Sequence, residues 1–511
     1  MYLENINSPA DVKAVGIDKL DILAGEVRKH LLQKLSDHGG HIGPNLGMVE
    51  ATVALHYVFN SPIDKMVFDV SHQSYAHKML TGRKDAFLNP AEYDEVSGYT
   101  EPSESEHDQF VVGHTSTSVS LACGLAKGRD LKGGKENVIA VIGDGSLSGG
   151  EALEGLDMAA ELDTNIIIVV NDNQMSIAEN HGGLYKNLQL LRETNGEAQC
   201  NLFKAMGLDY VYVGDGNNVK ALVEAFQKVK DTTRPVVVHI NTVKGKGYKF
   251  AEEQKERFHW GFPFVIETGE TKKEYQFGPD FGVHSSFIQR TYDQLSQDLC
   301  INNNAASIIV FGGTITGLND VTHLGFYDIT LLCNIPNMVY LAPTCKAEYD
   351  AMLRWSIHQT EHPVAIRVPN VPLEAANDTV TEESYGDLNR YQITHKGSEI
   401  AILGLGGYYA LAQKVAEKYK EKGIDATVIN PRFITGLDTA LLQDLQNGHH
   451  TVITLEDGQL DGGWGEKIAR FYGNTSMKVR CYGARKEFVD RFDYNDFLRG
   501  NHLTAEQIAE D

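Results

Sequence analysis

Residues 141–177, VIGDGSLSGGEALEGLDMAAELDTNIIIVVNDNQMSI, decide the fold of this chain. The apolar run Val138–Ile142 leads into a glycine-rich turn, a segment with helically spaced apolar residues and a second apolar run, Asn165–Val170. Short uninterrupted apolar runs are typical of strands that are buried on both faces of a parallel sheet. The stretch therefore predicts a strand–helix–strand unit whose two strands lie parallel in one sheet.

Oxygen-bearing residues follow each of these two strands. Asp144 comes directly after the first, and Asn173 ends the Asn-Asp-Asn run after the second. The carboxyl ends of parallel strands meet at one edge, where α/β sheets bind ligands. Mg²⁺ takes a few protein oxygens and fills its remaining positions with water and phosphate. We therefore predict an Mg²⁺ site of Asp144, Asn173 and the carbonyl oxygen of Met175. Glycines beside it would let backbone N–H groups approach a diphosphate.

Gly-Asp-Gly alone is weak evidence, because most such tripeptides are tight turns between a strand and a helix. Followed by a second strand and Asn-Asp-Asn, it is similar to the signature of thiamine-diphosphate enzymes. The resemblance implies two cofactors, thiamine diphosphate and Mg²⁺.

Length and composition set the class of protein. A chain of 511 residues suggests two to four domains, and three is the expected number. With 42% hydrophobic and 23% charged residues it reads as a soluble globular protein, and it contains no apolar run long enough for a membrane helix. The start, MYLENINSPADVKAV, lacks the pattern of a secretory signal, so we expect a cytoplasmic protein.

Charge and cysteine usage exclude several partners. The formal net charge of −23 repels nucleic acid and anionic membranes, so neither partner is expected. An anionic cofactor must then be held by a local cluster of cations and helix N-termini. The six cysteines show no CxxC pairing, which indicates reduced thiols rather than disulfides or a zinc site.

Strands alternate with helices along the whole chain. This order predicts an α/β protein of three stacked domains with mainly parallel sheets: 1–268, 269–385 and 386–511. A charged segment over 250–281 reads as the first junction. The second and third domains are expected to contain helices at Ile288–Leu299 and Tyr408–Lys422 and strands at Ser307–Phe311, Met338–Leu341, Val364–Val368, Ala426–Val428 and Thr451–Leu455.

Motifs from end to end resemble the 1-deoxy-D-xylulose-5-phosphate synthase family of the transketolase superfamily. Besides the metal motif they are GGHIGPNLGMVEATVALHYVFNSP (39–62), FDVSHQSYAHKMLTGRKD (68–85), VGHTSTSVSLACGLAKGRDLKG (112–133), KGKGY (244–248), SSFIQRTYDQ (285–294), DVTHLGFYD (320–328) and IPNM (335–338). The resemblance implies a transferase that condenses pyruvate with D-glyceraldehyde 3-phosphate, releases CO₂ and supplies isoprenoid, thiamine and pyridoxal synthesis. It also implies a homodimer. The first domain would hold the diphosphate and Mg²⁺, the second the aminopyrimidine ring, and the third would support the dimer.

Matching the motifs residue by residue implies the site. The expected catalytic residues are His41, His72, His259, His323 and Arg367, with Arg367 binding the acceptor phosphate or, alternatively, forming a salt bridge at a domain surface. The expected cofactor contacts are His72, Gly113, His114, Thr115, Gly145, Ser146, Asn173 and Tyr248. Tyr248 fits an ordinary core aromatic equally well. Lys244 and Lys246 fit a phosphate site or a solvated turn.

The chain departs from the family pattern in its second domain. The Ile-Ala-Glu segment, whose glutamate binds the aminopyrimidine, is absent, because ETGETKKEYQFGPDFG runs almost directly into VHSSFIQRTYDQ. A segment that was removed, left out as disordered or naturally lost would each explain this gap. Loss of the opening strands would leave backbone groups of a parallel sheet unpaired.

Three single positions also differ from the family. Gly312 stands where an arginine is usual, Asn319 where an aspartate is usual and His284 where a tyrosine is usual. These changes affect acceptor recognition. Two alternatives to the synthase therefore stay open: a transketolase-like ketol transferase with another acceptor, and a noncatalytic cofactor-binding paralogue.

Overall fold

The structure of the chain is a computed structural model that describes residues 2–273, 282–316, 320–369, 371, 373 and 382–511. The chain divides into two compact units, Met1–Tyr275 and Gln276–Asp511, and each is described by itself. The sequence predicted a first boundary after residue 268, close to this division. The second predicted boundary, after residue 385, falls inside the second unit and stays a prediction.

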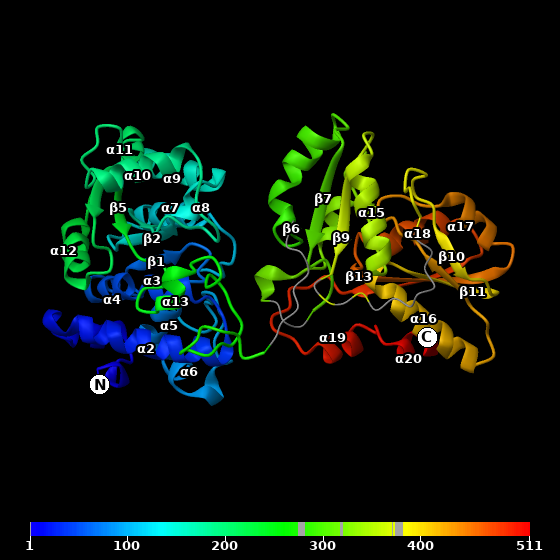
Figure 1. Cartoon of the computed structure of the whole chain (residues 1–511), viewed down its shortest axis with the longest axis horizontal. Coiled ribbons are helices and arrows are strands. Elements are labelled where there is room, and N and C mark those ends of the chain that lie inside the picture. Colours follow the sequence, from blue (N-terminus) through cyan, green and yellow to red (C-terminus); the bar gives the residue numbers. More distant parts are fainter. Residues whose placement is uncertain (1, 274–281, 317–319, 370, 372, 374–381) are drawn as a thin grey trace. The chain divides into compact units, whose positions relative to one another are not determined.

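The first unit contains a five-stranded sheet in which every neighbouring pair is parallel. The strand order is β1-β2-β3-β5-β4, and Figure 1 shows helices on its two faces. The predicted strand–helix–strand unit is confirmed: β2 leads through α8 (Asp144–Leu147) and α9 (Gly150–Leu162) into β3. The second strand begins and ends two residues later than predicted, at Ile167 and Asp172. The strands are β1 (Lys65–Phe68), β2 (Val138–Gly143), β3 (Ile167–Asp172), β4 (Asp209–Val213) and β5 (Val236–Asn241).

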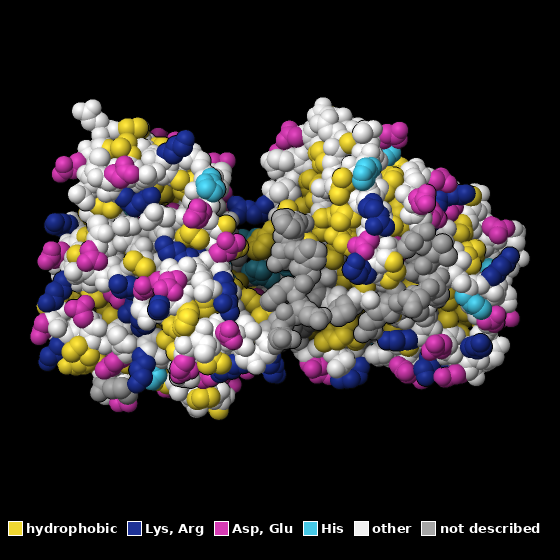
Figure 2. Space-filling model, viewed as in Figure 1, with side chains coloured by type: hydrophobic (Ala, Val, Ile, Leu, Met, Phe, Trp, Pro, Cys, Tyr) yellow, Lys and Arg dark blue, Asp and Glu magenta, His cyan; other side chains and the backbone are white. Residues whose placement is uncertain are grey.

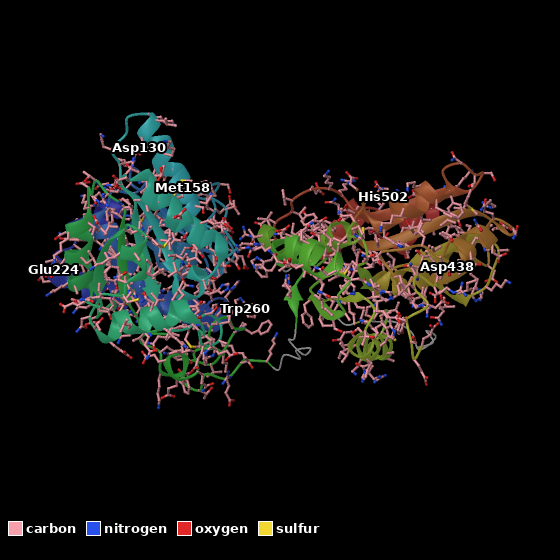
Figure 3. All side chains as sticks on the ribbon, turned by 90° about the horizontal axis from the view of Figure 1, so that it is seen from above. Asp130, Met158, Glu224, Trp260, Asp438 and His502 are labelled. Carbon is pink, nitrogen blue, oxygen red and sulfur yellow. The ribbon has the colours of Figure 1, made fainter. Side chains whose placement is uncertain are left out.

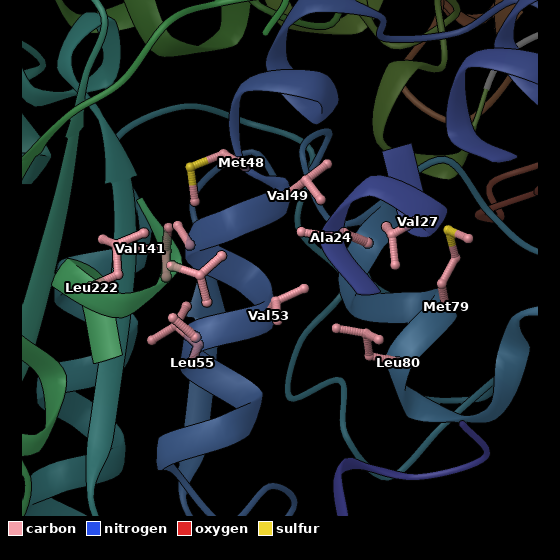
Figure 4. Close-up of a cluster of buried hydrophobic side chains, with 14 of the residues drawn as sticks. Ala24, Val27, Met48, Val49, Val53, Leu55, Met79, Leu80, Val141 and Leu222 are labelled. Carbon is pink, nitrogen blue, oxygen red and sulfur yellow. The ribbon is translucent and has the colours of Figure 1, made fainter. Parts of the chain in front are cut away.

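Strand β2 is buried on both faces because its side chains alternate between two cores. Ile139 and Val141 join the core under α4 (Val49–Val58) and α12 (Val219–Val229). Val138, Ala140 and Ile142 join the core under α7 (Ser118–Leu131) and α9. Figure 4 shows α4 inside the first of these cores, with Leu55 on the side of Val141 and Leu222. This double burial explains why the strand sequence is a continuous apolar run rather than an alternating one.

The main helices of this unit are α2 (Leu20–His38), α4 (Val49–Val58), α7 (Ser118–Leu131), α9 (Gly150–Leu162), α10 (Gly183–Glu193) and α12 (Val219–Val229). Its short helical segments are η1 (Leu3–Asn5), α1 (Pro9–Ala14), η2 (Ile17–Lys19), α3 (Gly43–Gly47), α5 (Tyr75–Lys78), η3 (Met79–Arg83), α6 (Asp85–Leu88), η4 (Pro90–Glu92), α8 (Asp144–Leu147), α11 (Leu202–Ala205) and α13 (Lys249–Glu253).

The described residues of the second unit form two sheets. The first is parallel, with the order β6-β7-β9-β8, and its edge strand β6 has only two residues. The second has the order β10-β12-β11-β13-β14, in which only the β10–β12 pair is antiparallel. The mainly parallel α/β architecture is therefore as predicted. The strands are β6 (Val283–His284), β7 (Ala306–Phe311), β8 (Val339–Leu341), β9 (Pro363–Val368), β10 (Gln392–His395), β11 (Glu399–Gly404), β12 (Thr427–Asn430), β13 (His449–Gln459) and β14 (Lys478–Ala484).

Both helices predicted for the second unit are present, but only one of them is a regular α-helix. The expected helix Tyr408–Lys422 is α16 (Tyr409–Glu421). The expected helix Ile288–Leu299 is helical throughout but irregular: it changes from a 3₁₀ segment, η5 (Ile288–Thr291), to a wider π-type segment, η6 (Gln294–Cys300). The remaining helical segments are η7 (Val321–His323), α14 (Asp328–Leu332), α15 (Lys346–His358), η8 (Gly406–Tyr408), α17 (Thr439–Leu445), α18 (Trp464–Tyr472), α19 (Tyr494–Gly500) and α20 (Ala505–Glu510).

Acidic and basic side chains are interspersed on the faces of both units that Figure 2 shows. Among the helices of the described residues, none is long and apolar enough to cross a membrane.

Candidate active site

The predicted metal ligands lie where the sequence placed them, at the carboxyl edge of the first sheet. Asp144 directly follows β2 and is 1% exposed. Its Oδ1 accepts a hydrogen bond from Gly145 N at 3.0 Å, and its Oδ2 accepts one from Asn180 Nδ2 at 3.0 Å. Asn173 is buried beyond the end of β3, and its Oδ1 accepts from Met175 N at 3.2 Å. Asp144 and Met175 line one hollow of about 640 Å³.

Two carboxylates meet at this edge. Burial, together with the neighbouring carboxylate of Asp172, raises the pKa of Asp144 to about 8. Burial alone would also raise the pKa of Asp172, but hydrogen bonds and charge from His239 and Arg192 hold it below its ordinary value. Asp172 therefore keeps its negative charge, whereas Asp144 needs a proton or a cation. A carboxylate, an amide oxygen and a main-chain carbonyl form a donor set that suits Mg²⁺.

A network of hydrogen-bonded polar side chains supports Asp172, and the sequence analysis did not predict this network. His239 Nε2 lies 2.9 Å from Asp172 Oδ2, and its Nδ1 lies 2.8 Å from the Tyr210 hydroxyl. Arg192 forms an ion pair with the same Asp172 oxygen. The available signal was His239 itself, a polar residue in the middle of the buried strand sequence PVVVHIN. Such residues are rare in a strand core unless they are paired.

The predicted cofactor-binding turns come together beside Asp144. Asp69, at the end of β1, accepts hydrogen bonds from Ser116 N at 2.8 Å and Ser118 N at 3.0 Å. These bonds fix the turn that carries Gly113, His114 and Thr115. The hydroxyl of Ser116 donates to the carbonyl of Ser146 at 2.7 Å, which joins this turn to the Gly145–Ser146 turn.

Three of the predicted catalytic histidines form one cluster in the first unit. The ring centroids of His41 and His72 are 4.8 Å apart. The ring centroid of His259 lies 5.8 Å from that of His41 and 5.4 Å from that of His72. Burial, reinforced by the charge of Lys244, lowers the pKa of His259 to about 3, so this imidazole is neutral at physiological pH. The next residue, Trp260, is 46% exposed and is labelled in Figure 3.

The two lysines of the KGKGY motif differ. Lys244 is 2% exposed, and its Nζ donates to the carbonyl of Ser176 at 2.6 Å. Burial lowers its pKa to about 8, although Asp144 opposes this shift. Lys244 is therefore a buried cation beside the predicted metal site. Lys246 is partly exposed, and its carbonyl accepts from Arg28 Nε at 2.8 Å.

Tyr248 lies in an aromatic cluster. Its ring centroid is 5.6 Å from those of Phe250, Phe258 and Phe264, and its hydroxyl donates to the carbonyl of Ile266 at 3.0 Å. These contacts fit the alternative that Tyr248 is an ordinary aromatic residue of the core. Its predicted contact with the cofactor stays a prediction.

The fourth predicted histidine belongs to the second unit. His323 ends η7, with its ring centroid 5.2 Å from that of Phe287 and 6.3 Å from that of His284. Gly312 has φ +68°, and a Cβ there would lie 2.5 Å from His284 Nε2. Two of the three departures from the family pattern are thus neighbours, and His284 occupies the space that a side chain at position 312 would need. Asn319 lies outside the described residues.

The environment of Arg367 argues against the expectation that it is free to bind a phosphate. The side chain is buried, its Nε donates to Asp328 Oδ2 at 2.8 Å, and its Nη1 pairs with Asp457. Its Nη2 donates to the carbonyls of Gly325 and Asp457 at 3.4 and 3.2 Å. Burial alone would lower the pKa of Arg367, but the two carboxylates raise it. The guanidinium is a structural ion-pair partner, closer to the salt-bridge alternative than to a phosphate ligand.

Comparison with known proteins agrees with the resemblance in the motifs. Residues 3–201 match the family described as 1-deoxy-D-xylulose-5-phosphate synthase. Three transketolase families match the thiamine diphosphate binding domain (residues 119–304), the pyrimidine binding domain (278–373) and the C-terminal domain (389–508). A solved transketolase from Campylobacter jejuni aligns with 97% of this chain and 99% of its own at 14% identity and a TM-score of 0.43, values too low to support an inference.

Curated relatives align over the whole length of the chain. The 1-deoxy-D-xylulose-5-phosphate synthase of Pelotomaculum thermopropionicum is 33% identical over 614 positions, covering 99% of this chain and 96% of the relative. That of Caldanaerobacter subterraneus subsp. tengcongensis is 34% identical, covering 99% and 98%. Because the first alignment has 614 positions and the chain has 511 residues, at least about one hundred positions have no residue of this chain. With 33–34% identity across 99% of its residues, the chain belongs to the 1-deoxy-D-xylulose-5-phosphate synthase family.

Proposed function

We propose that this protein is a thiamine-diphosphate-dependent transferase that condenses pyruvate with D-glyceraldehyde 3-phosphate to 1-deoxy-D-xylulose 5-phosphate and CO₂. The observation that carries the proposal is the end-to-end likeness to curated relatives that bear this synthase name. The transketolase-like alternative is less favoured, because the family match over residues 3–201 is to the synthase.

The first unit would hold the cofactors. Mg²⁺ would bind Asp144, Asn173 and the carbonyl of Met175, where its charge would replace the proton that Asp144 otherwise needs. Thiamine diphosphate, which supplies the electron sink, would contact the two joined turns and the neighbouring histidine. The proposed contacts are His72, Gly113, His114, Thr115, Gly145, Ser146, Asn173 and Tyr248.

The histidines would handle protons. The neutral imidazole of His259 is able to donate or accept a hydrogen bond at physiological pH, and it lies against His41 and His72, which would transfer the protons. His323 of the second unit is proposed to act on substrate oxygens in the same way. A proton relay of several imidazoles suits a reaction that loses CO₂ and then adds a carbon nucleophile to an aldehyde.

The proposal also includes the domain division, the oligomeric state, the pathway and the cellular location. The three-domain division, a homodimer and a role in isoprenoid and thiamine biosynthesis follow from the family. No disulfide joins the six cysteines in the part of the chain that the structure describes, which suits a reducing compartment, so the cytoplasm is the proposed location.

One observation favours a second candidate, a noncatalytic cofactor-binding paralogue. The alignment with relatives leaves at least about one hundred positions without a residue of this chain, and the expected glutamate segment is absent from the sequence. The test is an assay of the purified 511-residue chain with Mg²⁺ and thiamine diphosphate. Formation of deoxyxylulose phosphate and CO₂ supports the synthase. Cofactor binding without turnover supports the paralogue, and cleavage of xylulose 5-phosphate without use of pyruvate supports the ketol transferase.

A further inference from the structure

The clustered histidines sit on loops that need an external support. His41 follows Gly39 and Gly40, which have φ values of +86° and +125°. His72 follows Val70 and Ser71, which have φ values of +57° and +68°, in the left-handed region that non-glycine residues rarely occupy. Glycines adopt such angles freely, but the strained backbone of Val70 and Ser71 persists only where surrounding contacts hold it.

Asn45 provides such contacts to both loops. It lies on α3, and its side chain is fully buried. Its Nδ2 donates one hydrogen bond to the carbonyl of His41 at 2.8 Å and a second to the carbonyl of His72 at 2.7 Å. Its Oδ1 accepts from the backbone N–H of Tyr75 at 3.0 Å, at the start of α5. One amide thus joins two loops that are 31 residues apart and ties both to α5.

We propose that Asn45 is a positioning residue, which fixes the separation and orientation of the His41 and His72 imidazoles. The inference rests on the proposed function for its catalytic meaning, since it assigns Asn45 a role through histidines that would transfer protons. Asn45 itself touches the backbone carbonyls and not the reacting groups.

The chemistry of the three bonds explains why an amide is required. Both histidine carbonyls are acceptors, so the joining group must offer two donors, while Tyr75 N–H needs an acceptor. Aspartate has the same shape but offers acceptors only, so Asn45→Asp would place a carboxylate against two carbonyl oxygens. The expected result is separation of the two loops with little change in side-chain volume.

Asn137 is a matched control in the same unit. It is also a buried asparagine, 2% exposed, whose Nδ2 donates to Asp64 and Asp231, each at 3.0 Å. It precedes β2, at the opposite end of the strand from Asp144. Asn137→Asp therefore destabilises the same domain without contacting either histidine loop.

The first experiment uses the cofactor-free full chain. Proton–nitrogen correlation spectra of the imidazoles would be recorded for wild type, Asn45→Asp and Asn137→Asp, with melting temperatures measured in parallel. Position-specific shifts at His41 and His72 in Asn45→Asp, with those resonances unchanged in Asn137→Asp, are expected. Unchanged His41 and His72 resonances in folded Asn45→Asp, or equal changes in both variants, would overturn the proposal. If Asn45→Asp does not fold, Asn45→Ser, which keeps one donor, must give the same shifts at smaller amplitude; a folded Asn45→Ser with wild-type resonances is the contrary result.

The second experiment measures turnover in a form of the protein that decarboxylates pyruvate. Asn45→Asp should lower kcat about 10–100-fold, because small displacements of catalytic groups have effects of this size, while KM for pyruvate changes less than about threefold. Equal loss of kcat in Asn137→Asp would show that general destabilisation explains the effect. If no form of the chain turns pyruvate over, the proposed function fails, whereas the histidine spectra still decide whether Asn45 positions the cluster.

Discussion

The carboxyl edge of the first sheet and the Arg367 cluster of the second unit are both buried and charged, yet they differ in their charge balance. At the first, Arg192 pairs with Asp172, and the pKa of the neighbouring Asp144 is raised to about 8, so the charge of Asp144 is not offset. At the second, Arg367 is paired with Asp328 and Asp457, and its charge is fully offset. In this chain, the buried charge that is not offset belongs to the predicted metal site, whereas the offset charge belongs to a structural ion pair. Both regions contain residues that the family pattern singles out.

The largest expected effect is on stability, at Arg367. Arg367→Met should lower the free energy of unfolding by about 3–5 kcal/mol, because it leaves two buried carboxylates unpaired. Chemical denaturation of the second unit's signal measures this. The exposed pair Arg390–Asp387, 3.0 Å apart, supplies the control, and Arg390→Met should cost less than about 1 kcal/mol.

The same residue tests the phosphate interpretation. In an active form of the protein, a phosphate ligand at Arg367 predicts that Arg367→Ala raises KM for glyceraldehyde 3-phosphate much more than KM for glyceraldehyde. The ion pairs predict equal effects on both aldehydes. A folded, fully stable Arg367→Ala with a phosphate-selective KM would reverse our reading of this cluster.

The missing segment should have the next largest effect. The chain as it stands contains the residues of the first-unit site but lacks the expected glutamate, whose proton transfer would contribute about 10²–10⁴-fold to rate. Exchange of the cofactor C2 proton, followed by NMR, should be at least about a hundredfold slower than in a version carrying the homologous segment of a relative. Release of CO₂ should fall in parallel. Equal exchange rates would mean that another residue of this chain replaces the glutamate.

A smaller effect is expected at the metal site. Asp144→Ala removes the proposed charged ligand of Mg²⁺ and should weaken thiamine diphosphate binding more than tenfold, at least about 1.4 kcal/mol. Calorimetry with Mg²⁺ and with a chelator measures this, and the exposed residue Asp157 provides the control variant Asp157→Ala. Unchanged affinity in Asp144→Ala, or equal wild-type binding in the chelator, would remove Asp144 from the site.

The smallest effect concerns the pH dependence of stability. Because the pKa of His259 is about 3 in the folded state and 6.5 as its ordinary value, folding keeps this ring neutral while unfolding lets it take up a proton. Its contribution to stability is present above pH 6.5 and is lost as pH falls from 6.5 toward 3. His259→Gln should therefore flatten the decline of the melting temperature over this range. His450→Gln, at an exposed ring, should leave the decline as in wild type, and identical curves for all three proteins would contradict the assignment.

Much of the first unit could be predicted from sequence because its signals are local. A run such as Val138–Ile142 reports burial on both faces, and a polar residue next to it reports the strand end, so Asp144 and Asn173 were placed correctly. The second unit was predicted less well. The expected helix over 288–299 is present but irregular, because apolar spacing cannot distinguish a regular α-helix from 3₁₀ and π-type segments of similar periodicity.

By itself, the sequence determined the α/β class, the alternation of strands with helices, the family and the edge of the sheet that carries Asp144. These depend on residues within one or two turns or strands of each other. Tertiary structure alone decided that Asn45 joins two histidine loops, that His239 supports Asp172 and that Arg367 is neutralised. Arg367 pairs with Asp328 and Asp457, which are 39 and 90 residues away, and His239 with Asp172, 67 residues away. Whether a buried polar group is satisfied or available depends on such distant partners, and local sequence carries no record of them.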